Sequence, residues 1–528
     1  MNRTQRGTVL GSAFGLGMIF LDGTIVNVAL PDIQKGFGVG ESGVQWVVAA
    51  YAIGMAALIM TSATAADRWG RRRVYMIGLS VFVVASCVCG MAPTLGVLNI
   101  ARGVQGLAAA AVSVTSLSLV SAAFTNPDEK ARAIGIWTGI AAAALGLGPT
   151  LGGILTDLVG WRSVFFVTVP VGVAALVLTT GFVAESYDTA KRGLDPVGQV
   201  LYIATIMAFA WTVIQGPHAG WRSTSIVTTA MAVVIGLVAF VVWELRHSGP
   251  MMDLRLFANR TYTLANVVLF AVLFCFYGIL LILTQGWQNV RGASPLITGL
   301  ALLPIAIGQM IFAPRVGAWM KTVGARRLIL IGLSVFTAAM LIGVVGVEVH
   351  LGLVIICIAL TGIATSFTVT PSTTIAMRSV PEERAGMASG ILNAQRALGS
   401  AAGYAVLGTI IAAWLGATLN TSLEPVVPNA DERAAVASEI IDHANPHAFP
   451  AEIGPSRPVP ASSGATHEAI ADAAEADFKH GIQLALATCG VLTALVLALC
   501  WVGFPRDHQP PQPGEPSFAA PTHTPQPN

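Results

Sequence analysis

ADRWGRRR, at residues 66–73, lies between two long apolar segments and returns in altered form as MKTVGARR at residues 320–327. Each copy is soon followed by the same six residues, IGLSVF, at 77–82 and again at 331–336. The copies lie 254 positions apart, which indicates that a large part of the chain is duplicated.

A second pair of segments has the same spacing. PDEKA at residues 127–131 corresponds to PEERA at residues 381–385, again 254 positions later. Both pairs are charged segments next to long apolar stretches, so the duplicated unit is a bundle of membrane helices. Secondary transporters use such duplicated bundles to build a substrate site between two halves. The repeat therefore predicts a transporter architecture.

The composition places most of the chain in lipid. Of its 528 residues 54% are hydrophobic and only 11% are charged, and the mean hydropathy is +0.71. A membrane helix needs about 20 mainly apolar residues. We therefore expect an all-α membrane protein of the cell membrane with 14 transmembrane helices, at 8–30, 44–66, 74–92, 96–122, 133–156, 163–183, 197–215, 224–243, 262–286, 296–318, 328–347, 351–375, 386–415 and 481–503.

The 254-residue offset between the two copies contains eight predicted spans, two more than a six-helix unit. An extra helix pair is therefore expected between the duplicated units. We expect two pseudo-symmetric six-helix bundles, at 1–185 and 255–504, with the inserted helix pair at 186–254. A long extracellular loop is expected at 419–480. The Pro-rich residues 505–528 predict a disordered cytoplasmic tail.

The distribution of positive charge predicts the orientation. With the N-terminus in the cytoplasm, most of the 29 lysines and arginines fall on the cytoplasmic side. Both termini are therefore expected there. The first span is not expected to be a cleaved signal peptide, because it is long, contains Asp22 and leads directly into further spans. The net charge of +2 is scattered over short loops and gives no indication of nucleic-acid binding.

The charged loop after the second span is a candidate gate. A carboxylate among arginines at a helix end can hydrogen-bond neighbouring helix ends, and such contacts must break when two halves rock. The alternative is that these charges only set topology and contact lipid headgroups, but topology alone requires neither an aspartate nor a glycine. The candidate gating residues are Asp67, Arg68, Gly70, Arg71 and Arg72. Lys321 replaces the aspartate in the second copy.

Asp22 is the acidic residue that lies well inside a predicted span. A carboxylate held away from water can take up and release a proton near neutral pH, which is the property that a proton-coupled carrier needs. Its repeat counterpart is Phe276, so only one half carries the charge. The alternative is a structural acid, hydrogen-bonded to a neighbouring helix near the outer interface.

Arg102 is a second charge within a span. An arginine there is energetically costly and normally faces the bundle interior with a partner. Its repeat counterpart is the apolar Ile356 or Ile358, so the fold alone does not require it. The alternative is a side chain that extends to the membrane surface near the cytoplasmic end of its helix. We interpret Asp22 and Arg102 as the candidate proton-coupling residues.

The fifth span is unusually rich in glycine, and several other spans carry isolated polar or aromatic residues. Gly139, Gly148, Gly152 and Gly153 of the fifth span would let neighbouring helices approach closely, and Pro149 would kink the helix; packing of small residues is the alternative for the glycines alone. The candidate substrate-binding residues are Trp137, Gln285, Gln309 and Asn393, which helix packing explains nearly as well.

The sequence does not predict an enzyme, a cofactor or a metal site. No lysine directly follows a glycine, which excludes a P-loop, and no histidine lies in the middle of a span. Cys87 and Cys89 are interpreted as small buried apolar residues. His443 and His447 have helical spacing, but Pro446 lies between them.

These motifs together resemble the major facilitator superfamily, in particular its fourteen-span drug:proton antiporters. The loop signature G-x-x-x-D-R-x-G-R-R corresponds to residues 63–72, with Ala63 in place of the first glycine. The arginine motif of the fourth span corresponds to Arg102, Gln105 and Gly106. The first-helix pattern L-D-x-T-I-V-N-V-A-L-P corresponds to residues 21–31. The antiporter motif of the fifth span corresponds to Gly139, Gly148, Pro149, Gly152 and Gly153.

The resemblance implies export of drug-like small molecules in exchange for protons, by a monomer in the lipid bilayer. Several further stretches are similar to actinobacterial exporters of this subgroup, which implies tetracycline and spectinomycin among the substrates. Two alternatives remain: an exporter of an endogenous metabolite, or a membrane scaffold or sensor that does not transport and binds a partner through the 419–480 loop.

Overall fold

The structure is a computed structural model that describes residues 1–124, 126–186, 195–247, 249–380, 385–443, 446 and 467–504. The expected tail at 505–528 and residues 444–445 and 447–466 of the expected 419–480 loop lie outside these residues. Helices make up the described chain, which contains no strand. Of the helices in this part, 14 are long and apolar enough to cross a membrane, which confirms the expected number.

The helices follow one another with short connections. They are α1 (Arg3–Phe37), α2 (Glu41–Trp69), α3 (Arg71–Gly90), α4 (Leu95–Ala122), α5 (Pro127–Leu158), α6 (Ser163–Phe166), α7 (Thr168–Phe182), α8 (Pro196–Ala219), α9 (Thr224–Arg246), η1 (Leu254–Ala258), α10 (Arg260–Gln285), η2 (Gly286–Val290), α11 (Pro295–Trp319), α12 (Ala325–Val349), α13 (Leu351–Arg378), α14 (Ala385–Ser422), α15 (Ala430–His443) and α17 (His467–Gly503). The sixth span consists of α6 and α7, and the ninth of α10 and η2.

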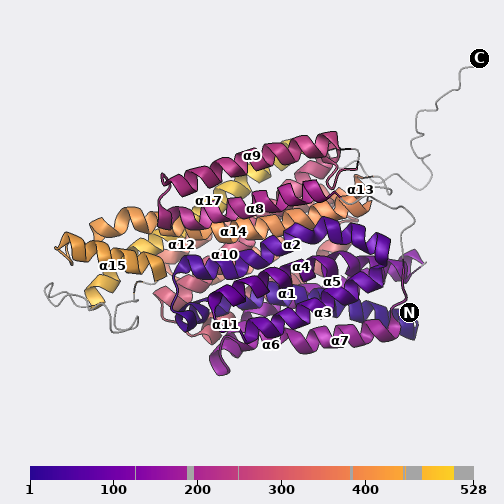
Figure 1. Ribbon diagram of the computed structural model, residues 1–528, viewed down its shortest axis with the longest axis horizontal. Coiled ribbons are helices and arrows are strands. Elements are labelled where there is room, and N and C mark those ends of the chain that lie inside the picture. Colours follow the sequence, from indigo (N-terminus) through magenta and orange to yellow (C-terminus); the bar gives the residue numbers. More distant parts are fainter. Residues whose placement is uncertain are drawn as a thin grey trace, which may run out of the picture.

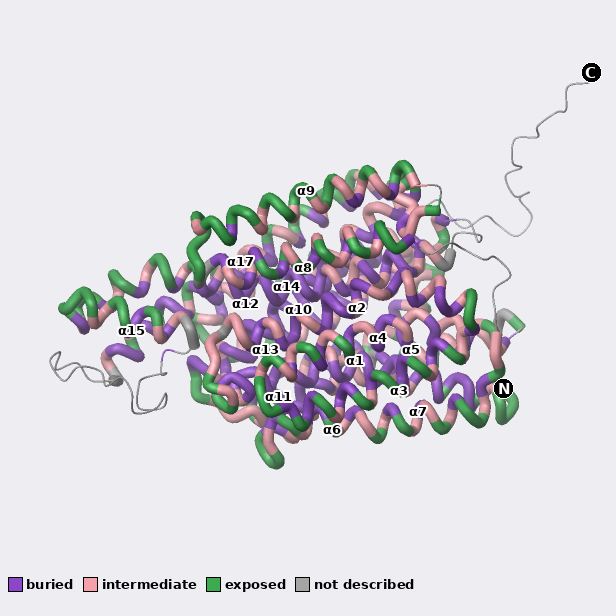
Figure 2. Tube along the Cα trace, in the orientation of Figure 1, coloured by how far each residue is buried: buried purple, intermediate pink, exposed green. Residues whose placement is uncertain are grey.

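The long helices run side by side along the longest axis of the molecule (Figure 1). The N-terminus lies at one end of this bundle, here called the N-terminal end, and α15 lies at the opposite end, here called the α15 end. Buried residues line the interior of the bundle, and exposed residues follow the outer faces of the peripheral helices (Figure 2).

The repeated loop has the same backbone feature in both copies. Gly70 ends α2 and precedes α3 with φ of 104°, and Gly324 precedes α12 with φ of 86°. Side chains other than glycine rarely adopt this region. The glycine that both copies retain is therefore explained by the sharp turn between two antiparallel spans.

The glycines of α5 let two neighbouring helices approach closely. A Cβ atom at Gly148 would lie 1.9 Å from Thr24 Oγ1 of α1, and one at Gly152 would lie 2.5 Å from the Ile25 carbonyl oxygen. A Cβ atom at Gly153 would lie 2.3 Å from the Pro295 carbonyl oxygen of α11. Glycine is thus required on two faces of α5, one against α1 and one against α11.

Contacts between α5 and α11 run from the α15 end to about the middle of both helices. Gly146 touches Ala306, and the Thr150 hydroxyl donates to the Gly299 carbonyl oxygen at 3.0 Å. Gly139 and Gly135 lie on the same face of α5 as Gly146, two and three turns closer to the N-terminal end. A Cβ atom at either position would meet nothing within 4 Å. The two helices therefore separate toward the N-terminal end.

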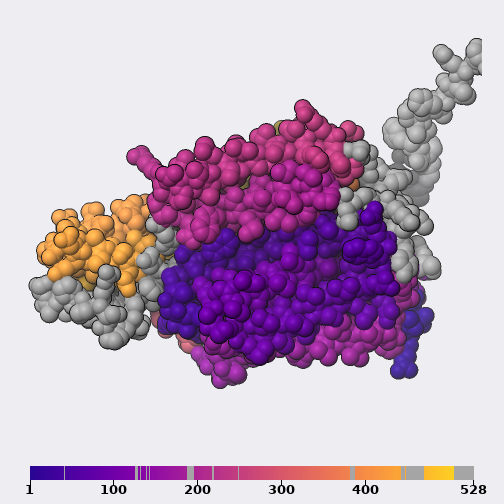
Figure 3. Space-filling view, in the orientation of Figure 1, coloured from indigo at the N-terminus to yellow at the C-terminus, as the bar shows by residue number. Residues whose placement is uncertain are grey.

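The helix pair α8 and α9 lies on the outside of the bundle, where Figure 3 shows it as a layer along one edge. Only 11% of the 18-residue apolar stretch of α9 is buried inside the protein, compared with 83% of the corresponding stretch in the span formed by α10 and η2. Polar contacts attach α8 to two helices. Gln199 bonds Thr61 and the Ala57 carbonyl of α2, and the Thr409 hydroxyl of α14 donates to the Val213 carbonyl at 2.8 Å.

The expectation of a loop from residue 419 onward is wrong. The helix α14 continues to Ser422, α15 is helical, and α17 already begins at His467. The apolar stripe of α14 extends past the expected span end through Leu419, and Leu423 follows directly after the helix; both are buried with residues of α15 and α17. These helices form an apolar cap at the α15 end.

We expect Gly153→Ala to destabilise the protein, because its Cβ would be forced against the backbone of α11. Overpacking of this kind costs about 1–3 kcal/mol. Gly139→Ala is the matched control: it adds the same methyl group where nothing lies within 4 Å. The thermal unfolding midpoint of the purified protein should fall for Gly153→Ala and stay level or rise for Gly139→Ala. Equal midpoints for the two variants would contradict the close approach of α5 and α11.

Candidate functional site

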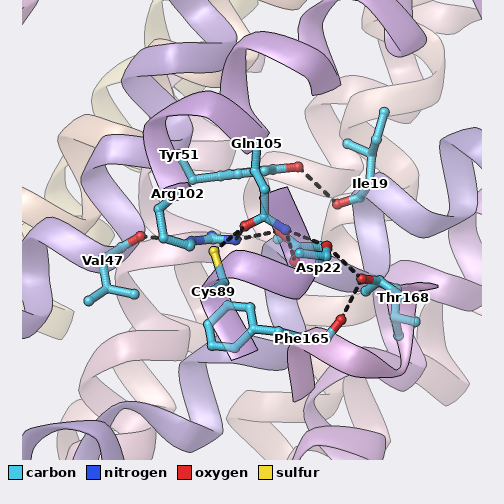
Figure 4. A network of polar contacts seen from close by, with 12 residues as sticks. Ile19, Asp22, Val47, Tyr51, Cys89, Arg102, Gln105, Phe165 and Thr168 are labelled. Atoms are coloured by element: carbon cyan, nitrogen blue, oxygen red, sulfur yellow. Dashed lines mark hydrogen bonds and ion pairs between the residues drawn. The ribbon is translucent and has the colours of Figure 1, made fainter. Parts of the chain in front are cut away.

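A buried ion pair joins α1 to α4. Arg102 Nη1 lies 2.6 Å from Asp22 Oδ2, and the two side chains are 1% and 0% exposed. The sequence had indicated each charge separately, and the structure makes them partners (Figure 4). Removal of one partner from such a pair costs about 3–5 kcal/mol, because the other charge is left buried and uncompensated.

The guanidinium of Arg102 has further partners on α2 and on its own helix. Its Nε donates to the Val47 carbonyl at 3.0 Å, and its Nη1 donates to Gln105 Oε1 at 2.9 Å. The guanidinium carbon lies 4.3 Å from the centre of the Tyr51 ring. Three helices therefore fix one side chain, which uses the forked geometry of a guanidinium.

The alternative interpretation of Arg102, a side chain extending to the cytoplasmic surface, is wrong. Arg102 is buried and lies near the start of α4, opposite Val47 near the start of α2. Both helices begin at the α15 end, so Arg102 lies in the half of the bundle away from the N-terminus. The physical reason is that Asp22 compensates the charge inside the bundle, so the side chain need not reach the surface.

A chain of hydrogen bonds continues from the ion pair toward α7. Gln105 Nε2 donates to Ser86 Oγ at 2.6 Å, and the hydroxyls of Ser86 and Thr168 lie 2.9 Å apart. The Thr168 hydroxyl also donates to the Phe165 carbonyl at 2.8 Å. Each of these three polar side chains is fully buried. The ion pair is thus connected to α3 and α7 as well as to α1, α2 and α4.

Sequence reasoning missed Tyr51, Ser86 and Thr168. Each lies in an apolar span that also contains other hydroxyl side chains, and serine and threonine in spans commonly bond their own helix backbone. Nothing in the local sequence separates such a residue from one that faces a buried charge. Only Gln105 carried a signal, because it belongs to the motif that contains Arg102.

The candidate gate residues lie at the N-terminal end, far along the helices from the ion pair. Arg71 Nη2 lies 3.4 Å from Asp67 Oδ1, one turn away, and both side chains are partly exposed. The Arg71 backbone amide donates to the Ser186 carbonyl at 3.0 Å. Arg68 lies in the last turn of α2. The loop is therefore attached to the segment that follows α7.

Glu185 caps the start of α3, a role that the sequence did not reveal. Its carboxylate accepts the backbone amides of Arg72 at 2.9 Å and Arg73 at 3.1 Å. A carboxylate at this position satisfies free amides and interacts favourably with the helix dipole. A Cβ atom at Gly70 would lie 2.6 Å from Glu185 Cδ, so this glycine is required by space as well as by its backbone conformation.

The four candidate substrate residues lie on four different helices. Within the described residues, neither Trp137 Nε1 on α5 nor the amide group of Gln309 on α11 has a hydrogen-bond partner. Asn393 on α14 accepts a long bond of 3.4 Å from Arg396. Gln285, at the end of α10, is buried. The unsatisfied polar atoms of Trp137 and Gln309 are available to a bound molecule or to water.

Comparison with known proteins identifies the family. The Major Facilitator Superfamily pattern matches residues 12–252 and 265–420. The chain belongs to this superfamily. Within the superfamily it is a membrane transporter and not an enzyme.

Several curated relatives cover nearly the whole chain. The multidrug resistance protein Stp of Mycobacterium tuberculosis (strain CDC 1551 / Oshkosh) is 48% identical over 96% of this chain and 93% of its own. The drug efflux pump JefA of the same strain is 41% identical over 96% and 99%. The tetracenomycin C resistance and export protein of Streptomyces glaucescens is 29% identical over 98% and 94%.

The fold is also similar to solved transporters. A bacterial homologue of the human lysosomal transporter Spinster, in an inward-facing and occupied conformation, aligns with a TM-score of 0.61 over 96% of this chain and 98% of its own. Its sequence identity to this chain is 15%, so the similarity concerns the fold alone.

We expect Glu185→Ala to loosen the first turn of α3, because two backbone amides lose their acceptor. Loss of a helix cap costs about 0.5–2 kcal/mol. The backbone amides of Arg72 and Arg73 should therefore exchange their hydrogen faster, by roughly tenfold for each 1.4 kcal/mol of capping free energy that is lost. Glu348→Ala serves as the control, since that carboxylate is 52% exposed at the end of α12. Unchanged exchange at Arg72 and Arg73 in Glu185→Ala would rule out the capping role.

Proposed function

We propose that this protein is a secondary active transporter that exports drug-like small molecules from the cell in exchange for protons. The observation that carries the proposal is the fully buried ion pair between Asp22 and Arg102. Its relatives named as a multidrug resistance protein, a drug efflux pump and a resistance and export protein support drug export as the activity.

The ion pair offers a way to couple a proton to a change of state. A proton on Asp22 removes its negative charge and so weakens the attraction to Arg102, which then keeps its uncharged partners Val47, Gln105 and Tyr51. Coupling requires that proton binding favours one conformation over the other. Here the conformation that holds the pair together is favoured when Asp22 is charged.

We propose that the two bundles at 1–185 and 255–504 rock against each other, with α8 and α9 as an inserted pair within 186–254. With both termini in the cytoplasm, the separation of α5 and α11 toward the N-terminal end corresponds to an inward-open state. Contacts between the halves at the α15 end support this assignment. Gln288 Nε2 donates to the Val28 carbonyl at 2.8 Å, and Thr150 bonds Gly299.

We propose that the glycines of α5 permit the tight closure at the α15 end, and that the loop at Asp67 takes part in closing the N-terminal end. The packing of Gly148 and Gly152 on α1 and of Gly153 on α11 supports the first role. The ion pair of Asp67 with Arg71, next to the capped start of α3, supports the second.

Two other functions compete with drug export. An exporter of an endogenous metabolite would use the same machinery, and a substrate profile of a deletion strain would distinguish it. A scaffold or sensor that uses the 419–480 region would lose its function when the α15 cap is deleted and would tolerate Asp22→Asn. Tetracycline and spectinomycin are the first substrates to test. We propose that the protein transports as a monomer.

We expect Asp22→Asn to bind substrate but to lose uphill efflux in proteoliposomes with an imposed proton gradient. Asparagine keeps the shape of the side chain but cannot take up a proton. Asp22→Glu should retain part of the activity, and Glu348→Gln, a change at an exposed carboxylate, should retain all of it. If Asp22→Asn exported drug uphill and still moved protons into the vesicle, the coupling proton would be carried elsewhere.

We expect Arg102→Lys to be impaired as well, although the charge is kept. A lysine ammonium cannot reproduce the set of contacts to Asp22, Gln105 and Val47 that the guanidinium makes. Proton-driven efflux should fall by about tenfold or more, the equivalent of about 1.4 kcal/mol. Full efflux in Arg102→Lys would show that charge alone matters at this position.

A further inference from the structure

The C-terminal half contains a charge that the ion pair does not explain. Arg396 lies on α14 inside the membrane-spanning segment Met387–Ser422, in its first third, and is half-buried. Among the residues described, no carboxylate interacts with its guanidinium. From α10 to α14 the described chain has one acidic residue, Glu348, whose side chain is 52% exposed at the end of α12 and is paired with His480.

The hydrogen bonds of Arg396 leave most of its donors free. Its Nη2 donates to Thr373 Oγ1 of α13 at 2.5 Å, and its Nη1 makes the long contact to Asn393 at 3.4 Å. Its Nε has no partner within the described part of the chain. A guanidinium has five N–H donors, and its fork matches the two oxygens of a carboxylate.

A tyrosine of α10 connects Arg396 to the N-terminal half. Arg396 interacts electrostatically with Tyr277 of α10. The Tyr277 hydroxyl lies 3.8 Å from the position that a Cβ atom at Gly23 would occupy, next to Asp22. Tyr277 thus connects the surroundings of Arg396 to the N-terminal half.

The two halves therefore differ in charge. In the N-terminal half Asp22 compensates Arg102, whereas the described part of the chain offers no counter-ion for Arg396. A charge inside a membrane protein is costly unless a partner or water compensates it, and such residues commonly mark a substrate path. The missing anion can be supplied by the molecule that is carried.

We propose that Arg396 binds a carboxylate or another acidic oxygen of the exported molecule, with the Thr373 hydroxyl holding the guanidinium in place. The inference rests on the proposed export function and adds a substrate class to it: molecules that carry an anionic group. Charge-assisted contacts of this kind give both affinity and orientation.

Binding to the purified full-length protein tests the proposal directly. Rhodamine 110, which has a free carboxylate, and rhodamine 123, its methyl ester, are the probes, and fluorescence anisotropy gives their Kd values. The wild-type protein should bind the acid about tenfold or more tightly than the ester. Arg396→Gln should abolish this preference and keep the affinity for the ester within about twofold, and Arg396→Lys should retain part of the preference.

Arg315→Gln is the matched control, because it removes an exposed positive charge from α11. It should leave the preference unchanged. Equal binding of acid and ester by the wild-type protein would overturn the proposal, and so would a preference that survives Arg396→Gln. Equal weakening of both probes in Arg396→Gln would assign the arginine a structural role instead. Efflux of rhodamine 123 by the wild-type protein tests the export function separately.

Discussion

The ion pair between Asp22 and Arg102 is the constraint on which the N-terminal half depends. Its two charges are removed from water, so each is tolerated only while the other is close. The surrounding helices are arranged accordingly: α2 supplies the Val47 carbonyl, and Ser86 of α3 and Thr168 of α7 satisfy Gln105 and each other. Gly148 of α5 packs on Thr24 of α1, only two residues from Asp22. A change in the ion pair is therefore transmitted to α5, which also contacts α11.

The duplication supplies the frame of the molecule, and single substitutions within the frame supply its chemistry. Gly70 and Gly324 make the same turn in both halves. The charges are not duplicated: Phe276 occupies the place equivalent to Asp22, and among the residues that the structure describes no carboxylate pairs with Arg396. In the mechanism we propose, the ion pair of the N-terminal half exchanges the proton and Arg396 of the C-terminal half binds the substrate.

The sequence predicted the number and approximate ends of the spans, because apolar length is a property of each segment alone. It also identified Asp22 and Arg102, since a charge in an apolar span is conspicuous. Their pairing, the role of Glu185 and the contacts of Ser86 and Thr168 depend on which helices meet, and a single sequence does not contain that information. The apolar cap was misread as a loop because the acidic and Pro-containing stretch around it hid the apolar stripe of α14.

We propose that Asp22 is the group that exchanges the proton. Infrared difference spectra of the purified protein between alkaline and acidic pH detect the carbonyl stretch of a protonated carboxylic acid. In the wild-type protein, acidification should produce a band from a carboxyl group shielded from water, and this band should be missing in Asp22→Asn and present in Glu348→Gln. A band of the same intensity in Asp22→Asn would contradict the account.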